Sequence, residues 1–497
     1  MLFGLQAKRL SALSPSHDVH PLGEEPFNFE FHPSGGKFHL RGTDDALTAY
    51  GGLVAWDHFL SKTGILNKLA EDYPLPRTSP NATPVEDILN AFALNSLVGG
   101  KRFAHMRRLQ DDRAIAKILG LLKGRLCGED AFRRLCAPLE VNQARQWMEG
   151  AERAIYQALP NHCISDWDST VCTRYGSQED VAVGYNPQKP GRPSHHPLVC
   201  AIAGTRMALH MEWRKGNTVS ATGWIEAMEK VWRNPIAQHR IQLNRGDIGF
   251  GQEKIMAWHE EEGAHRPRYL FKLKLTQNVK RAIQAVDWPE WQGHPTEGMQ
   301  QLAELKLKLT GWSQTRRVVV SRTLKPLNPG PQEDFWRLGD EIIHAYVTNL
   351  DEEQAEAFQI VELYRQRGDA ENVFDELKNQ WGFAGFCAQN AVVSECAARL
   401  LLLIYNLWSI FVRVIKNQQG HTEAITSRYE LLMIPGRLVT SGRQKTLRLA
   451  VGNKLGKLLK AAYKRLIDWL SQTAPQLALD SGKSPPWLLF NPLAYPG

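Results

Sequence analysis

Apolar residues recur at two different periods along this chain, and the change of period divides it into regions. Between residues 46 and 155 they stand three or four positions apart, which predicts helices with one buried face. Residues 1–45 show no such period, apart from 27–32, whose alternation predicts a short strand. We therefore expect a mainly helical N-terminal region.

From about residue 160 the pattern changes to short apolar or alternating runs bounded by turn residues, which is typical of strands. The predicted strands lie at 162–172, 196–205, 206–214, 239–250 and 268–275, with helices at 222–235 and 252–263. The order strand, strand, strand, helix, strand, helix, strand predicts a mixed α/β core.

The pattern changes again after this core. Residues 275–350 contain three segments that alternate or are rich in β-branched residues, and they predict a small β-rich region. Residues 352–381 follow a helical period with one break. The most apolar stretch, 397–412, is short for a membrane span and is bounded by charged residues, so we expect a buried core helix.

Composition limits the classes of function. Lysine and arginine total 60 against 52 acidic residues, so the formal charge is +8, which permits a polyanionic partner without establishing one. The seven cysteines are odd in number and none has CxxC spacing, which argues against a zinc knuckle or a disulfide framework and favours a reducing cytoplasm. The N-terminal residues lack the long apolar segment of a signal peptide.

Two acidic motifs stand at predicted strands. Asp166 and Asp168 are two apart on one strand, so their carboxylates share a face and repel each other unless a cation lies between them. The alternative is a surface strand with both acids in water. Asp247 follows an apolar strand and precedes a glycine turn, a position where α/β sheets place active sites, although a plain turn aspartate fits equally well.

A third candidate group lies in the helical segment after the β-rich region. Tyr364, Arg367, Glu371 and Lys378 are offset by 0, 3, 7 and 14 positions. At about 100° per residue they fall within an arc of roughly 60° on one helix face. This column is either a solvent-facing set of ion pairs, such as Arg367 with Glu371, or a polar stripe with a function.

Together these groups suit phosphoryl transfer. Two metal ions about 4 Å apart need carboxylates from separate elements, and Mg²⁺ prefers such hard oxygen ligands, with Mn²⁺ as a substitute. Arg367 and Lys378 would contact phosphates, and Tyr364 would hold a phosphate or stack beside it.

The series Tyr-x2-Arg-x3-Glu-x6-Lys at 364–378 resembles the signature of a large branch of bacterial insertion-sequence transposases of the DDE type. Residues 168–170 (DST), 245–250 (RGDIGF) and the loop at 175–198 resemble the flanking motifs of that family. The resemblance implies that Asp168, Asp247 and Glu371 are catalytic and bind two Mg²⁺ ions. It favours Asp168 over Asp166 because the family's first acid directly precedes the small-residue–Thr pair.

The resemblance also implies a fold: an RNase H-like mixed-sheet α/β core interrupted by a β-rich insertion, with helical N-terminal and C-terminal regions. The expected divisions are a DNA-binding or dimerisation region, the two parts of the core on either side of the insertion, and a basic C-terminal region that binds DNA or dimerises. Their bounds are 1–155, 156–274, 275–350 (the insertion), 351–415 and 416–497.

Family members of this kind act as homodimers on paired transposon ends, so the expected partners are transposon-end double-stranded DNA, target DNA and a second copy, without a membrane. Some relatives form a DNA hairpin and stack an aromatic residue on a flipped base. His344 and Tyr346 stand near the corresponding position here, where a tryptophan is absent, so the hairpin step stays open. The alternatives are another RNase H-like nuclease and a catalytically inactive, transposase-derived DNA-binding protein.

Overall fold

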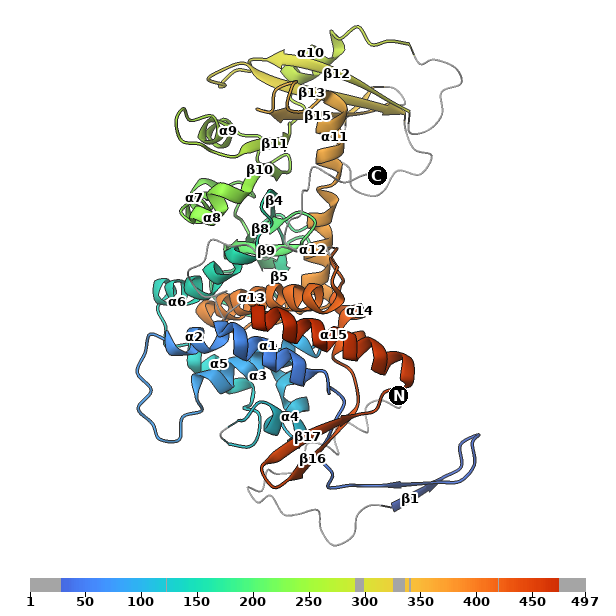
Figure 1. Ribbon diagram of the computed structural model, residues 1–497. Helices are drawn as coiled ribbons and strands as arrows, with labels where there is room; N and C mark the ends of the chain where they lie inside the picture. The colour runs from blue at the N-terminus through green and yellow to red at the C-terminus, as the bar shows by residue number, and fades with distance from the viewer. Residues whose placement is uncertain are drawn as a thin grey trace, which may run out of the picture.

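The computed structural model describes residues 28–121, 123–290, 299–324, 336–338, 341–418 and 420–472. The predicted helical region is confirmed, and Figure 1 shows it packed below the long helix α13 (Ala391–Lys416), with the sheet above. Its buried apolar faces belong to one continuous core with α13. Its helices are α1 (Leu53–Thr63), α2 (Ile65–Glu71), α3 (Val85–Leu97), η2 (Phe103–Leu109), α4 (Arg113–Ile118), α5 (Glu129–Cys136), α6 (Val141–Ala154) and η3 (Ile155–Ala158).

The predicted mixed α/β core is also confirmed, as a sheet of nine strands among the described residues. Its path is β12-β13-β15-β11-β10-β4-β8-β9, with β14 beside β15; β4, β10 and β11 run parallel, and the other pairings are antiparallel. The strands of the first part are β4 (Cys163–Ser169), β8 (Leu198–Ile202), β9 (Met207–Glu212), β10 (Ile241–Gly246) and β11 (Arg268–Lys272). Between them lie α7 (Trp224–Trp232), α8 (Pro235–Arg240) and α9 (Glu253–His259).

The β-rich segment at 275–350 continues this same sheet. Its strands are β12 (Gln300–Leu307), β13 (Arg316–Leu324), β14 (Trp336–Leu338) and β15 (Glu341–Thr348), preceded by α10 (Gln277–Gln284). Strand β15 pairs with β11 in antiparallel register, with Leu270 opposite Thr348. Most of β15 is buried, which explains why its sequence is apolar on both faces.

The helical pattern after β15 contains one break, as predicted, and divides into α11 (Ala357–Arg365) and α12 (Gly368–Asn379). The two follow each other along nearly one line in Figure 1. Because Tyr364 belongs to α11 and Arg367 is the N-cap of α12, the expected four-residue column does not lie on one continuous helix. Arg367 keeps helical dihedral angles, so the turn between the helices is tight.

Helix α13 forms the centre of the molecule. It begins where the Asn390 side chain accepts a hydrogen bond from the Val393 amide and ends at Asn417, whose φ of 51° is left-handed. By length and hydropathy it could cross a membrane, but its most apolar window is completely buried in the protein. Among the residues described, three smaller sheets lie outside the main one: β1 (Asn28–Phe31) with β2 (Phe38–Arg41); β17 (Gln444–Leu449), β16 (Gly436–Ser441) and β3 (Leu47–Thr48); and β5 (Cys172–Thr173), β7 (Pro193–His195) and β6 (Ala182–Val183). Helices α14 (Ala424–Leu431) and α15 (Asn453–Gln472) complete the described chain.

Candidate functional site

Two of the expected acids lie at adjoining strand ends. Strands β4 and β10 run parallel, with Trp167 opposite Gly246, so the next residues, Asp168 and Asp247, follow side by side at the carboxyl edge. The Asp168 carboxylate accepts a hydrogen bond from the Ser169 amide at 2.7 Å, and that of Asp247 accepts one from the Gly249 amide at 2.9 Å. Both side chains are only partly buried, so the two carboxylates lie at an accessible edge of the sheet.

Asp166 has a different role. It lies opposite Arg245 in the register of β4 and β10, and both side chains are fully buried. The Arg245 guanidinium holds both Asp166 oxygens, at 2.6 and 2.7 Å, and also donates to the Leu363 carbonyl. This bidentate pair uses both carboxylate oxygens of Asp166, so Asp168 is the more exposed of the two acids on this strand.

Arg367 connects α12 to the end of β4. Its guanidinium lies 2.9 Å from the second oxygen of Asp168 and is buried. Burial alone would lower the pKa of Arg367, but the nearby Asp168, Tyr364, Asp166 and Asp247 raise it above its usual range. The site therefore holds a permanent positive charge directly beside the two strand-end acids.

Tyr364 borders the same acids from the last turn of α11. Burial raises the pKa of its hydroxyl, and the charges of Asp247 and Asp168 act in the same direction while Arg367 opposes them. The phenol is therefore neutral at physiological pH and can donate a hydrogen bond. Its ring packs against Tyr346 of β15, with centroids 4.7 Å apart.

Glu371 is exposed in the first turn of α12, four residues after Arg367 and therefore about 6 Å farther along the helix axis. Lys378 lies in the last turn and is half-buried. Across the described ranges, no three His, Cys, Asp or Glu side chains are close enough together to hold a metal ion. The structure thus gathers Asp168, Asp247, Tyr364 and Arg367, and leaves Glu371 outside that group.

His344 and Tyr346 lie on β15 with ring centroids 6.3 Å apart. Tyr346 is buried, and burial raises the pKa of its hydroxyl to about 12. His344 is largely buried as well, and burial first, then Lys272 and Arg365, lowers its pKa to about 4. In this conformation the Tyr346 ring contacts Tyr364 and does not face solvent.

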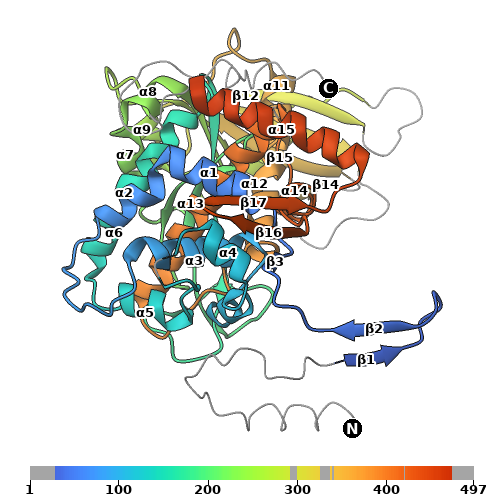
Figure 2. The ribbon, with the colours of Figure 1, turned by 60° about the horizontal axis from the view of Figure 1, so that its bottom comes forward.

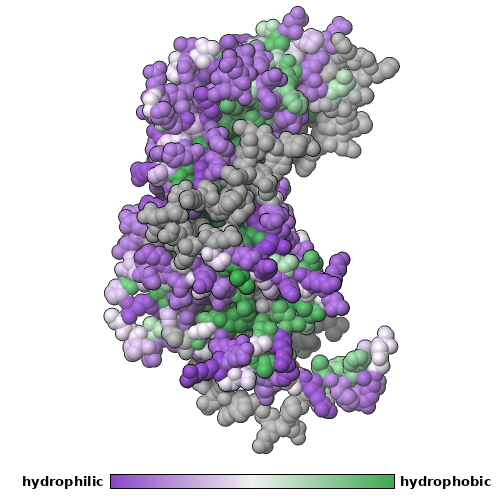
Figure 3. Space-filling model, viewed as in Figure 1, coloured by the Kyte–Doolittle hydropathy of each residue, from purple (hydrophilic) through white to green (hydrophobic). Residues whose placement is uncertain are grey.

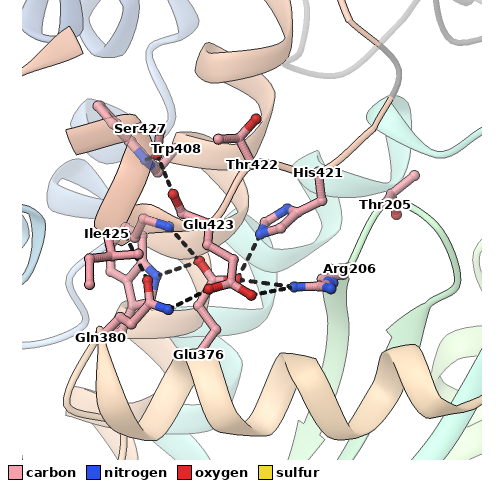
Figure 4. A network of polar contacts seen from close by, with 12 residues as sticks. Thr205, Arg206, Glu376, Gln380, Trp408, His421, Thr422, Glu423, Ile425 and Ser427 are labelled. Carbon is pink, nitrogen blue, oxygen red and sulfur yellow. Dashed lines mark hydrogen bonds and ion pairs between the residues drawn. The ribbon is translucent and has the colours of Figure 1, made fainter. Parts of the chain in front are cut away.

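A network of polar contacts attaches α12 to the start of α14 and to the turn between β8 and β9, and Figure 4 shows it from close by. Glu376, buried five residues after Glu371, accepts hydrogen bonds from the Ala424 amide at 2.9 Å and from His421 at 2.7 Å. Burial would raise the pKa of Glu376, but the His421 contacts outweigh it and hold the pKa below its usual range. An ionised Glu376 thus attaches α12 to the start of α14.

Arg206 completes this network from the turn between β8 and β9. It adopts a φ of 55°, donates to Asp369 at 2.8 Å and to Glu423 at 3.2 Å, and lies 3.8 Å from Glu376. Since Asp369 and Glu376 are both on α12, one guanidinium holds that helix against the sheet. Nothing in the sequence pattern pointed to this residue.

His196 is a second residue that the sequence analysis missed. It directly follows β7, its Nδ1 lies 2.7 Å from the Thr218 carbonyl, and its ring is buried. Burial lowers its pKa; Asp168 acts in the opposite direction and Lys378 in the same direction, so both charges lie within electrostatic range of the ring. The paired histidines at 195–196, directly before β8, were the only signal in the sequence.

Comparison with known proteins identifies the family to which the chain belongs. Residues 34–470 match the family described as "Transposase DDE domain group 1". No curated protein matches the sequence. Among solved structures, the chain is similar to the piggyBac transposase in its synaptic complex with hairpin DNA, with a TM-score of 0.41, 10% sequence identity and 88% of each chain covered.

Proposed function

Because the chain belongs to the family of DDE transposase domains of group 1, we propose that it is a cut-and-paste DNA transposase that cleaves transposon ends and joins them to target DNA. Asp168, Asp247 and Glu371 are the acids of the site. The observation that carries the proposal is the placement of Asp168 and Asp247 at neighbouring ends of the parallel strands β4 and β10, with Arg367 on Asp168.

The strand order supports an RNase H-like core. The segment β9-β8-β4-β10-β11 has three antiparallel strands followed by two parallel ones, and the chain then adds β15, β13 and β12 to the β11 edge. In this arrangement the first acid lies near the end of the central strand of the five, and the second directly follows its neighbour β10. The β-rich segment at 275–350 is the insertion between the second acid and the third.

The donor chemistry of the site fits magnesium. Asp168 and Asp247 offer partly exposed carboxylate oxygens at one edge of the sheet, and Glu371 would complete the set from α12. A pair of Mg²⁺ ions, or Mn²⁺, would supply activation of a water or a 3′-hydroxyl and stabilisation of the leaving oxygen.

The remaining residues bind and position DNA. Arg367 offers a buried, permanent charge next to the acids, and Lys378 extends this positive side along α12. Tyr364, as a neutral phenol, can donate to a phosphate oxygen. His344 and Tyr346 support Tyr364 from β15 and would reach DNA only if this edge opens.

The proposed partners are transposon-end and target double-stranded DNA and a second copy of the chain, in the bacterial cytoplasm at the nucleoid. The net charge of +8 suits a polyanion. Lysines and arginines on β16, β17 and α15 would contribute phosphate contacts, so DNA affinity should fall steeply with salt.

The test is cleavage and strand transfer of DNA carrying the element's own ends, with Mg²⁺, by the purified protein. We expect Asp247→Ala and Glu371→Gln to abolish both steps. Asp375→Asn, an exposed acid one turn after Glu371 on the same helix, is the matched control and should remain active. Denaturing gels of the products also report whether a DNA hairpin forms.

The outcomes separate the alternatives. Cleavage without joined product indicates another nuclease of the same fold. DNA binding without any metal-dependent cleavage indicates a DNA-binding protein derived from a transposase. Full activity of Asp247→Ala overturns the assignment of the site.

A further inference from the structure

The hairpin of β16 and β17 has two faces of different character. Because side chains alternate between the faces of a strand, each pair of residues that lie opposite each other shares one face. On the inner face Leu449 lies so close to Gly51 that an added Cβ there would overlap its side chain. The outer face carries the following residues, and all of them except Val439 are exposed: Arg437, Val439, Ser441, Gln444, Thr446 and Arg448.

The hairpin carries positive charge that the protein itself does not balance. Residues 436–449 include no acid and these cations: Arg437, Arg443, Lys445 and Arg448. Arg437 and Arg448 lie directly opposite each other on the outer face, where like charges repel. Asp45 pairs with Arg437 at 2.8 Å, whereas Arg448 has no hydrogen bond or ion pair among the residues that the structure describes. A polyanion on the outer face would relieve this repulsion, which favours nucleic acid as the partner.

The shape of the hairpin fits a groove of double-stranded DNA. Its strands are joined by a loop of two residues, in which Gly442 adopts a φ of 58°, so the ribbon stays two strands wide to its tip. Adjacent strands lie about 5 Å apart. The major groove of DNA is about 12 Å wide and admits a two-stranded ribbon, whereas the minor groove is only about 6 Å wide. Figure 1 shows the hairpin at the lower end of the molecule.

Helix α15, which begins four residues after β17, adds a column of cations. At 100° per residue its exposed lysines fall within about 120° on one side of the helix: Lys454, Lys457, Lys460 and Lys464. The opposite side, with Leu459, Ala462 and Leu466, is buried in the core. Figure 2 shows α15 and the β16–β17 hairpin on the side that faces the viewer, and Figure 3 shows the β1–β2 hairpin as a separate projection at the lower right. The cations of α15 and of β16–β17 therefore lie on one side of the molecule.

We propose that the outer face of the β16–β17 hairpin lies in the major groove of the transposon end and reads its base sequence. Arg448 can bond the edge of a guanine at two points, Gln444 that of an adenine, and Thr446 between them can bond either. The lysines of α15 hold neighbouring phosphates, which position the duplex without reading it. DNA fits better than an acidic protein, because the uncharged Ser441, Gln444 and Thr446 match base edges. The inference rests on the proposed function, which supplies the transposon end, and adds the residues that distinguish its sequence.

The first experiment titrates the full chain, without Mg²⁺, with a duplex of the element's own end and with a scrambled duplex of equal length, at several salt concentrations. We expect Gln444→Ala/Thr446→Ala to lower the ratio of the two affinities roughly ten- to a hundredfold, although the charge is unchanged. Thr440→Ala, the same kind of change on the inner face, is the matched control and should keep the wild-type ratio. Lys457→Ala should weaken both duplexes equally and lower the salt slope by about one. All four positions are exposed, so the thermal melting of these variants should match the wild type.

The second experiment identifies the groove. Guanine presents its N7 atom in the major groove, so each guanine of the end is replaced in turn by 7-deazaguanine. We expect one replacement to weaken binding by the wild type about fivefold or more and to leave binding by Arg448→Ala unchanged. A wild type that does not distinguish the two duplexes, an equal loss on both in Gln444→Ala/Thr446→Ala, an unchanged ratio in that variant, or no replacement that depends on Arg448 overturns the proposal. Because neither measurement contains Mg²⁺, failure here leaves the cleavage test of the proposed function untouched.

Discussion

Arg367 and Asp168 lie 2.9 Å apart and join the start of α12 to the end of β4. Two residues earlier on the same strand, Asp166 holds Arg245 in a second arginine–aspartate pair. The pairs differ in environment, because Asp166 is completely enclosed whereas Asp168 is partly open. One strand thus carries a structural acid and an acid available for chemistry.

This difference predicts unequal effects for two similar substitutions. Asp166→Asn leaves the buried Arg245 charge without its partner, so we expect a loss of roughly 3–5 kcal/mol of unfolding free energy. Asp168→Asn also weakens the pairing of the buried Arg367, but Asp166 and Asp247 still face that charge, so we expect a smaller loss of roughly 1–3 kcal/mol together with the loss of DNA cleavage. Urea denaturation and the cleavage assay on both variants provide the check, and an active Asp168→Asn protein that is destabilised more than Asp166→Asn would reverse the two roles.

The polar network of Glu376, His421 and Arg206 that holds α12 should affect both stability and the cleavage rate. Glu376→Gln removes the charge that His421 and Arg206 face, so we expect a stability loss of about 1–3 kcal/mol. It should also lower the cleavage rate at saturating DNA, since α12 carries Glu371. Because the pKa of Glu376 is held low by His421, its contribution is present at neutral pH and is lost as pH falls through that lowered pKa, so variant and wild type should converge in acid. If Glu376→Gln has wild-type stability at pH 7, this network does not hold α12 in place.

Asp57 on α1 should oppose folding at neutral pH. Burial, and then the charge of Glu86, raises the pKa of Asp57 to about 6 from 3.8. A carboxyl whose pKa is raised on folding costs stability as pH rises through the interval between the two values. Asp57→Asn should therefore stabilise the protein by about 1–2 kcal/mol at pH 7, after allowance for partial exposure, and by nearly nothing at pH 4. Thermal melts at both pH values test this, and an equal effect at the two would refute the cause given.

Substitutions at Tyr346 distinguish a role in the protein core from a direct contact with DNA. Its ring is buried against Tyr364, so Tyr346→Ala should cost roughly 3–5 kcal/mol, as for other buried aromatic residues, whereas Tyr346→Phe should be close to wild type. If Tyr346 instead stacks on DNA, the alanine variant keeps its stability and loses affinity for transposon ends. Denaturation and DNA titration of both variants distinguish these results.

The sequence by itself determined the elements and the order of the acids. Apolar periodicity predicted the N-terminal helices, the strands of the core, a break within residues 352–381 and the buried helix at 397–412, because each depends on residues close together in the chain. The spacing of Tyr364, Arg367, Glu371 and Lys378 likewise lies within one segment, and the family match supports the transposase assignment drawn from it.

Tertiary structure alone decided which groups meet. Asp166 and Asp168 are equivalent in the strand pattern, where the family resemblance alone favoured Asp168; the pairing of β4 with β10 is what gives Arg245 to Asp166 and leaves Asp168 at the more exposed end of the strand. The same holds for Arg206, which reaches α12 from a turn 163 positions away, and for the placement of β15 beside β11. These contacts depend on strand register and helix packing between distant segments, and local periodicity carries no information about either.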